Sequence, residues 1–227
     1  GPFFFLKDTV LSNEIKASQI AAQARWEKEI FGITSKVKVY QSFKNEYSTQ
    51  ALRVNLSRLI FREIILDASY NYRSQPLNFN FYLTQSDFRE YNWENSSLKN
   101  QNFKTQSIFL SHPKWGSIRG DWTSINNYTF FNNITPLRNL NEKFILEVLQ
   151  TDKKIDYLKV RLDNRFDFGN FSWVNNLQYQ KVNQEENTEE LLSGPLALNV
   201  PEWLIRSTFM LTSSIFNKAL FFQSGFT

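Results

Sequence analysis

The sequence predicts an all-β protein: an antiparallel transmembrane β-barrel with about 10–12 strands in this chain. Three observations predict this fold. Apolar and polar residues alternate along most of the 227 residues, which is the pattern of strands with one apolar face. Several runs approach the length of about ten residues that crosses a bilayer, whereas strands of globular sheets usually have about five or six. Tryptophan and tyrosine residues lie near the ends of these runs, as they do in the interfacial girdles of membrane barrels.

The clearest strand covers residues 158–168. Its apolar side carries Leu158, Val160, Leu162, Phe166 and Phe168, and its other side carries Lys159, Arg161, Asp163, Arg165 and Asp167. Gly169 and Asn170 then supply a two-residue turn of the kind that closes hairpins. The chain returns as a second alternating run that reaches Gln180. We therefore expect a β-hairpin at residues 158–180.

Similar runs precede and follow this hairpin. The Ala and Gln residues within 14–29 are compatible with a helix, but the alternation there favours a strand. Strands are expected at residues 20–30, 37–44, 52–60, 64–73, 77–84 and 203–212. The polar segments 92–102 and 184–195 are expected to be loops. Residues 1–227 then form a single β-barrel domain, with Gly1 and Pro2 as the remnant of a cleaved tag.

The composition excludes several classes of function. The chain has no cysteine, so disulfides, thiol nucleophiles and cysteine-ligated metal sites are excluded. A serine triad would have to use the one histidine, His112, with a serine such as Ser111 or Ser117. No nucleophile motif is present, so we expect no enzyme, no metal and no cofactor. The 26 basic and 22 acidic residues are scattered, and no nucleic-acid partner is expected.

Alternation by itself is equally compatible with a soluble β-sandwich or a lipocalin-like binding protein, whose apolar faces form a core. Strand length and aromatic placement favour the membrane barrel. The candidate interfacial aromatics are Trp26, Tyr40, Tyr70, Tyr72, Tyr128, Trp173, Tyr179 and Trp203. This interpretation requires the row of Leu158 and Leu162 to face lipid. A row buried in a dry core, with Arg161 and Asp163 in bulk solvent, would refute it.

Four segments carry a resemblance to a known family. Residues 126–131 (NNYTFF), followed by Pro136, come first. Residues 176–180 (NLQYQ) and 198–202 (LNVPE) follow, and residues 214–225 (SIFNKALFFQSG) are the last. In this order they resemble segments of the putative porins of Bacteroidota, a family of outer-membrane β-barrels.

The resemblance covers residues 91–227 and extends more loosely back to about residue 18. It implies a porin in the cell outer membrane, with lipid as its partner and further strands after the last segment. The expected function is a passive channel for small solutes or a barrel scaffold. In either case the candidate lumen-lining residues are Lys159, Arg161, Asp163, Arg165 and Asp167. The alternative is a structural subunit of a larger outer-membrane complex for secretion, uptake or barrel assembly, which would bind other outer-membrane proteins or copies of itself.

Overall fold

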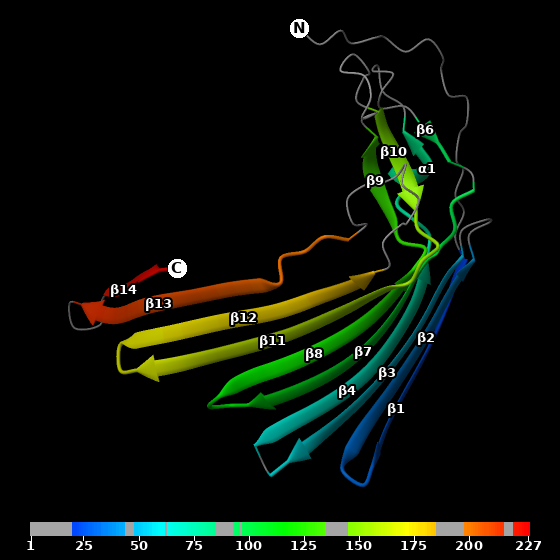
Figure 1. Cartoon of the computed structure of the whole chain (residues 1–227). Coiled ribbons are helices and arrows are strands. Elements are labelled where there is room, and N and C mark those ends of the chain that lie inside the picture. Colours follow the sequence, from blue (N-terminus) through cyan, green and yellow to red (C-terminus); the bar gives the residue numbers. More distant parts are fainter. Residues whose placement is uncertain are drawn as a thin grey trace, which may run out of the picture.

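Ten strands of the chain form one antiparallel sheet, which twists and curves from its first strand to its last (Figure 1). The structure is a computed structural model that describes residues 20–43, 48–61, 63–84, 93–95, 97–134, 145–184, 198–215 and 220–227. In spatial order the strands are β1 (Ile20–Ile30), β2 (Ile33–Phe43), β3 (Thr49–Ile60), β4 (Ile64–Gln75), β7 (Gln101–His112), β8 (Gly116–Asn126), β11 (Ile155–Phe168), β12 (Phe171–Gln184), β13 (Trp203–Ile215) and β14 (Leu220–Phe226). The expected all-β antiparallel class is confirmed, and strand order follows the chain.

The predicted hairpin at residues 158–180 is confirmed as β11 and β12. Gly169 and Asn170 form its turn, and Gly169 has a φ of 62°. A comparable turn joins β1 to β2, where both Phe31 and Gly32 have positive φ, at 52° and 72°. Two positive φ angles are what a type I′ turn requires, because its twist matches that of the flanking strands. A phenylalanine is an unusual residue in this conformation.

The two ends of the sheet differ in their connections. Turns of two or three residues join β1 to β2, β3 to β4, β7 to β8 and β11 to β12, all at one end, which we call the hairpin end. At the opposite end, the loop end, the chain takes residues 76–100 to pass from β4 to β7 and residues 127–154 to pass from β8 to β11. The predicted loop at 184–195 leaves β12 at this end, and residues 185–197 lie outside the described part of the chain.

The long connections contain two small sheets that stand beyond the loop end of the large sheet (Figure 1). One pairs β9 (Thr129–Ile134) with β10 (Ile145–Gln150), and the other pairs β5 (Leu83–Thr84) with β6 (Trp93–Glu94). Their aromatic rings contact one another, because Phe131 stacks on Phe81 at 4.8 Å and meets Trp93 edge-on at 5.5 Å. The predicted loop at 92–102 therefore contains β6 and leads directly into β7.

The strand expected at residues 77–84 is wrong for most of its length. Phe79–Tyr82 form a single helical turn, α1, and β5 takes the last two residues. Asn78 explains the difference, because its side-chain Oδ1 accepts the Asn80 backbone N–H at 3.1 Å and its carbonyl accepts the Phe81 N–H at 2.9 Å. A side chain that accepts a backbone N–H two residues ahead begins a turn and competes with a strand.

The hairpins are staggered across the sheet. The last residue pair of β8 and β11 is Ser117 with Asp163, and β11 continues to Phe168 beyond it. In the same way Phe171 pairs with Leu211, and β13 continues to Ile215 beyond that pair. In a β-barrel, a steady stagger of this kind goes with strands that tilt relative to the barrel axis. The stagger is therefore the one expected of a sheet that curls towards a barrel. In the described residues β1 and β14 are the two outer strands, and no closed barrel is formed.

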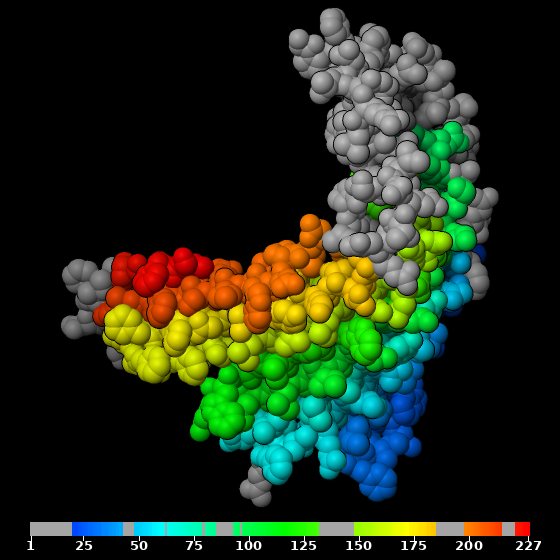
Figure 2. Space-filling model, in the orientation of Figure 1, coloured from blue at the N-terminus to red at the C-terminus, as the bar shows by residue number. Residues whose placement is uncertain are grey.

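The large sheet is a single layer. On the face drawn in Figure 2 the strands follow one another in order of colour, from blue through green and yellow to red. In the described part of the chain, the buried hydrophobic residues are Leu77, Tyr82, Ile125 and Ile155. A β-sandwich buries one whole face of each sheet against the other, so this sheet lacks the core that a sandwich requires. No helix among the described residues has the length and apolarity needed to cross a membrane.

Candidate functional site

The strand register divides the large sheet into two chemically different faces. Side chains alternate between faces along a strand, and directly paired residues share a face. The face that carries Lys159, Arg161 and Asp163 is called the polar face, and the face that carries Leu158 and Leu162 is called the apolar face. Charged residues of the other strands that register places on the polar face are Arg25, Glu27, Glu29, Lys36, Lys38, Arg53, Asp67, Arg73, Arg119, Asp121 and Arg206.

Asp121 is the centre of a polar network on this face. Its Oδ1 accepts hydrogen bonds from Ser107 Oγ at 2.6 Å and Arg119 Nε at 2.9 Å, and its Oδ2 lies 3.3 Å from Lys159 Nζ. Its residue exposure is 5%, and that of Ser107 is 8%. A carboxylate this well covered is stable as an anion because each oxygen has a donor.

The remaining candidate lumen-lining residues form two further groups along β11. Arg161 Nε lies 2.8 Å from Asp163 Oδ2, and Asp163 also accepts the Asn176 side-chain amide from β12. Nearer the turn, Arg165 Nε donates to Asp167 Oδ1 at 2.9 Å, and Asp167 accepts the Ser172 hydroxyl. The structure therefore brings all five predicted residues to one face, as arginine–aspartate pairs two residues apart and cross-strand contacts.

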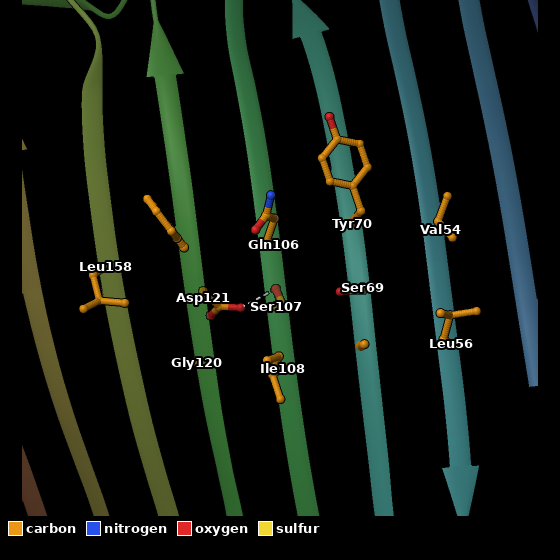
Figure 3. Close-up of a pocket in the computed structure, with 12 residues that line it drawn as sticks. Val54, Leu56, Ser69, Tyr70, Gln106, Ser107, Ile108, Gly120, Asp121 and Leu158 are labelled. Atoms are coloured by element: carbon orange, nitrogen blue, oxygen red, sulfur yellow. Dashed lines mark hydrogen bonds between the residues drawn. The ribbon is translucent and has the colours of Figure 1, made fainter. Parts of the chain in front are cut away.

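The apolar face is exposed where a soluble sheet would be covered. Leu158 is 41% exposed, Leu162 37%, Trp122 57% and Ile108 64%. A shallow apolar groove of about 480 Å³ crosses five strands, with Ala68 and Gly120 as its small residues. Figure 3 shows this region, with Leu158 and Ile108 on their strands and a dashed line between Ser107 and Asp121. The row of Leu158 and Leu162 is thus not buried in a dry core.

Charged residues on the apolar face lie near the strand ends. Lys28 and Arg58 are near the hairpin end, whereas Lys104, Asp156 and Lys181 are near the loop end. Along β12 the apolar face has no charge from Phe171 until Lys181. Ten steps of about 3.3 Å, tilted by about 40°, span about 25 Å. That height equals the apolar band of outer-membrane barrels, which is about 25 Å.

A cluster of polar side chains on the apolar face lies inside this band, and its members hydrogen-bond to one another: Asn164, Trp173, Asn175 and Ser207. The hydrogen bonds run across β11, β12 and β13: Trp173 Nε1 donates to Ser207 Oγ at 2.7 Å, and Ser207 donates to Asn175 Oδ1 at 2.8 Å. Asn175 Nδ2 then donates to Asn164 Oδ1 at 3.1 Å. Mutual pairing lowers the cost of polar side chains in an apolar environment.

The candidate interfacial aromatics occupy several places. Trp26, Tyr70, Tyr72, Trp173, Tyr179 and Trp203 lie on the apolar face. Tyr179 and Trp203 contact each other at 4.8 Å, and Trp173 stacks on Phe209 at 5.5 Å. Tyr40 instead lies on the polar face of β2, and Tyr128 lies outside the large sheet, between β8 and β9.

Aromatic residues also mark the hairpin end, and the sequence reasoning missed most of them. Phe31 is 93% exposed, Phe61 85%, Trp115 71% and Phe168 63%, each at or beside a different turn. Phe61, like Phe31, has a positive φ, at 51°. The sequence contains a signal for three of them, because Phe31 and Phe61 directly follow an alternating run and Phe168 ends one. Exposed aromatic rings at every described turn fit an interfacial girdle at this end.

His112 contacts Glu63, Lys114 and Trp115 and is not positioned as the base of a serine triad. Its Nδ1 accepts the Lys114 backbone N–H at 3.1 Å, and its Nε2 lies 3.1 Å from Glu63 Oε2. Its ring stacks on Trp115 at 4.5 Å. Ser111 and Ser117 pair with each other on the polar face, whereas His112 pairs with Gly116 on the apolar face. Across the residues that the structure describes, no cluster of three or more His, Cys, Asp or Glu side chains fits a metal ion.

Comparison with known proteins gives one finding. A family model described as "Putative porin" matches residues 3–227. Searches of curated proteins and of solved structures gave no match.

Proposed function

Because the chain belongs to the family described as "Putative porin", we propose that its large sheet forms part of the wall of a transmembrane β-barrel in the cell outer membrane. Small solutes pass through this barrel. In this arrangement the apolar face contacts lipid and the polar face lines water. The candidate lumen-lining residues Lys159, Arg161, Asp163, Arg165 and Asp167 belong to that water-filled side. Selectivity then depends on these charges and on their cross-strand neighbours.

One observation carries this proposal: large apolar side chains are exposed across the apolar face, while polar side chains are buried on the opposite face of the same sheet. Asp121 and Gln180 are 5% and 4% exposed on the polar face, while Trp122 and Ile108 are more than half exposed on the apolar face. Extended exposed apolar surface of this kind marks a membrane or interaction surface. In lipid, only a closed set of strands satisfies every backbone group, so the two outer strands of this sheet require partners in the complete barrel.

The asymmetry of the two ends gives the proposed barrel a direction. Outer-membrane barrels have short turns on the periplasmic side and longer loops outside the cell. The hairpin end, with its two- and three-residue turns, is then periplasmic. The loop end, with α1 and the sheets β5–β6 and β9–β10, faces the cell exterior.

Reconstitution of the full-length protein into planar lipid bilayers tests the channel. We expect stepwise currents from protein that also shows heat-modifiable migration in gels. Arg165→Glu should shift the reversal potential in a salt gradient towards cations, because Arg165 lies on the polar face. The matched control is Lys181→Glu, which makes the same charge change on the apolar face and should leave the potential unchanged. Folded, inserted protein that passes no current would contradict the channel.

A second candidate function is a structural subunit of a larger outer-membrane complex. The sheets beyond the loop end favour it, since hydrogen bonds connect β10 to the segment that leads into β7, and connect that segment to the residue that follows β8. Gln150 Oε1 accepts the Lys99 N–H at 2.9 Å, and Asn127 Nδ2 donates to the Asn100 carbonyl at 3.0 Å. Native mass measurement in mild detergent distinguishes the two candidates. A subunit should retain stoichiometric partners from native membranes, whereas a channel should have the mass of one chain or of a homo-oligomer.

A further inference from the structure

The polar face of β11, β12 and β13 contains a second hollow, with a volume of about 260 Å³. Five of its lining residues lie on the polar face: Arg161, Asn176, Gln178, Leu204 and Arg206. Its volume is several times the share of one water molecule in the liquid, about 30 Å³. It therefore has room for a small solute group together with some of its water.

The two arginines lie on opposite sides of this hollow. Arg161 pairs with Gln178 on β12, and Arg206 pairs with Asn176 from the other flank of that strand. Two strand spacings of about 4.8 Å and two residue steps of about 3.3 Å separate their Cα atoms by about 12 Å. Two arginine side chains at this separation are long enough to contact one small group over β12.

The charge around the hollow is not balanced. Each of the three neighbouring carboxylates already has donors: Asp121 has Arg119, Lys159 and Ser107, Asp163 has Arg161 and Asn176, and Asp167 has Arg165 and Ser172. Arg206 has no carboxylate partner among the residues that the structure describes. Arg119 and Arg161 are direct cross-strand partners, an arrangement of like charges that costs stability. Arg206 therefore brings to the hollow a positive charge that no described carboxylate pairs with.

We propose that this hollow is a subsite for the oxyanion group, carboxylate or phosphate, of a small anionic solute. The guanidinium groups of Arg161 and Arg206 bind the oxyanion from two sides, since guanidinium matches the planar geometry of carboxylate and phosphate oxygens. Leu204, which is 45% exposed at the same hollow, contacts the apolar part of the solute. The proposal rests on the proposed function in one respect, because solute reaches the hollow from the barrel lumen.

The first test measures binding without conduction. Inorganic phosphate is titrated into the folded full-length protein in detergent at low ionic strength, and the phosphorus resonance is followed by NMR. We expect saturable broadening for the wild type, and an apparent dissociation constant about tenfold higher for Arg206→Gln, as befits loss of one charge-assisted hydrogen bond. Arg206→Lys should retain part of the affinity, because it keeps the charge and loses the planar donor geometry.

Lys181→Gln is the matched control. It removes one positive charge from the apolar face of β12, three residues from Gln178, and should leave phosphate binding unchanged. Equal binding by Arg206→Gln and Lys181→Gln would overturn the subsite, as would a wild type without saturable broadening. Heat-modifiable migration verifies that each variant is folded.

Conductance separates this proposal from the channel itself. A channel that conducts, but whose phosphate affinity does not depend on Arg206, contradicts the subsite and leaves the channel. Arg206-dependent phosphate binding by a protein that passes no current supports the subsite and contradicts the channel.

Discussion

The two faces of β11 show how one strand meets two environments. On the polar face, Asp163 has an arginine and an amide as partners, and its side chain is 33% exposed. On the apolar face, one residue away, Leu162 is 37% exposed with no apolar layer above it in the described structure. Similar exposure therefore has opposite meanings. The polar groups have bonding partners, whereas the apolar groups lack the contacts that a soluble core would give them.

The same comparison holds for the charged side chains. On the polar face they run along the full length of the strands and form pairs such as Lys36 with Glu27 at 2.9 Å. On the apolar face they lie near the strand ends, as Lys28 and Lys181 do. A sheet in water has no reason to keep charges out of the middle of one exposed face. A sheet in lipid does, because a charge near the bilayer centre costs several kcal/mol.

The largest expected effect comes from moving one charge across the sheet. Leu56 and Ser57 are adjacent in β3 and lie on the apolar and polar faces respectively. We expect Leu56→Arg to destabilise the folded protein in lipid bilayers by about 2 kcal/mol, the lower end of the cost of a lipid-facing arginine, because Leu56 lies two residues further from the hairpin end than Arg58. Ser57→Arg should cost less than about 1 kcal/mol, because its side chain enters the polar face beside Asp67. Urea titration in liposomes, followed by heat-modifiable migration, measures both.

The same two variants, Leu56→Arg and Ser57→Arg, also test whether water covers the apolar face. Leu56 is already 44% exposed, so arginine there would be nearly neutral if water covered the apolar face. Equal stability of the two variants in bilayers would refute a lipid-facing apolar face.

The next effect contrasts two carboxylates of the polar face. Asp121 has a side-chain exposure of 6%, and Asp167 has one of 56%. We expect Asp121→Ala to lower the free energy of unfolding by about 1–3 kcal/mol, because Ser107, Arg119 and Lys159 lose their common acceptor. Asp167→Ala should leave the urea midpoint unchanged within error, since exposed pairs contribute little. An Asp167→Ala effect as large as that of Asp121→Ala would mean that water does not reach the polar face near the turns.

Much of the sheet was predictable from residue alternation. The strands that were not predicted are those in which the alternation is broken. The hairpin of β11 and β12 alternates almost without interruption and was predicted from its sequence. β7 and β8 were not, because β7 places Lys104 and Gln106 on the apolar face and Phe103 on the polar face. Phe103 is tolerated there because the Arg73 guanidinium lies 5.1 Å above its ring. That contact comes from a neighbouring strand, so the sequence of β7 alone does not reveal it.

The candidate site, too, was predictable from sequence only in part. The five charged residues on the polar face of β11 were predictable from their own strand, because they alternate. Asp121, which links three strands, and Arg206, which faces β12, depend on register. Register is set by turns such as Gly169–Asn170 across several hairpins, and a shift of one residue would place both on the other face.

The smallest expected effect concerns the cluster of hydrogen-bonded polar side chains on the otherwise apolar face. Asn164 and Asn175 face lipid in the proposed barrel and hydrogen-bond to each other, while Ser207 bonds to Asn175. A double-mutant cycle of Asn164→Ala and Asn175→Ala should give a coupling free energy of about 0.6 kcal/mol in bilayers, the average for such pairs in membranes. Because Asn175 is the central member, Asn175→Ala alone should cost more than Asn164→Ala alone. Zero coupling would mean that water already satisfies these amides, and the apolar face would then be wet at this depth.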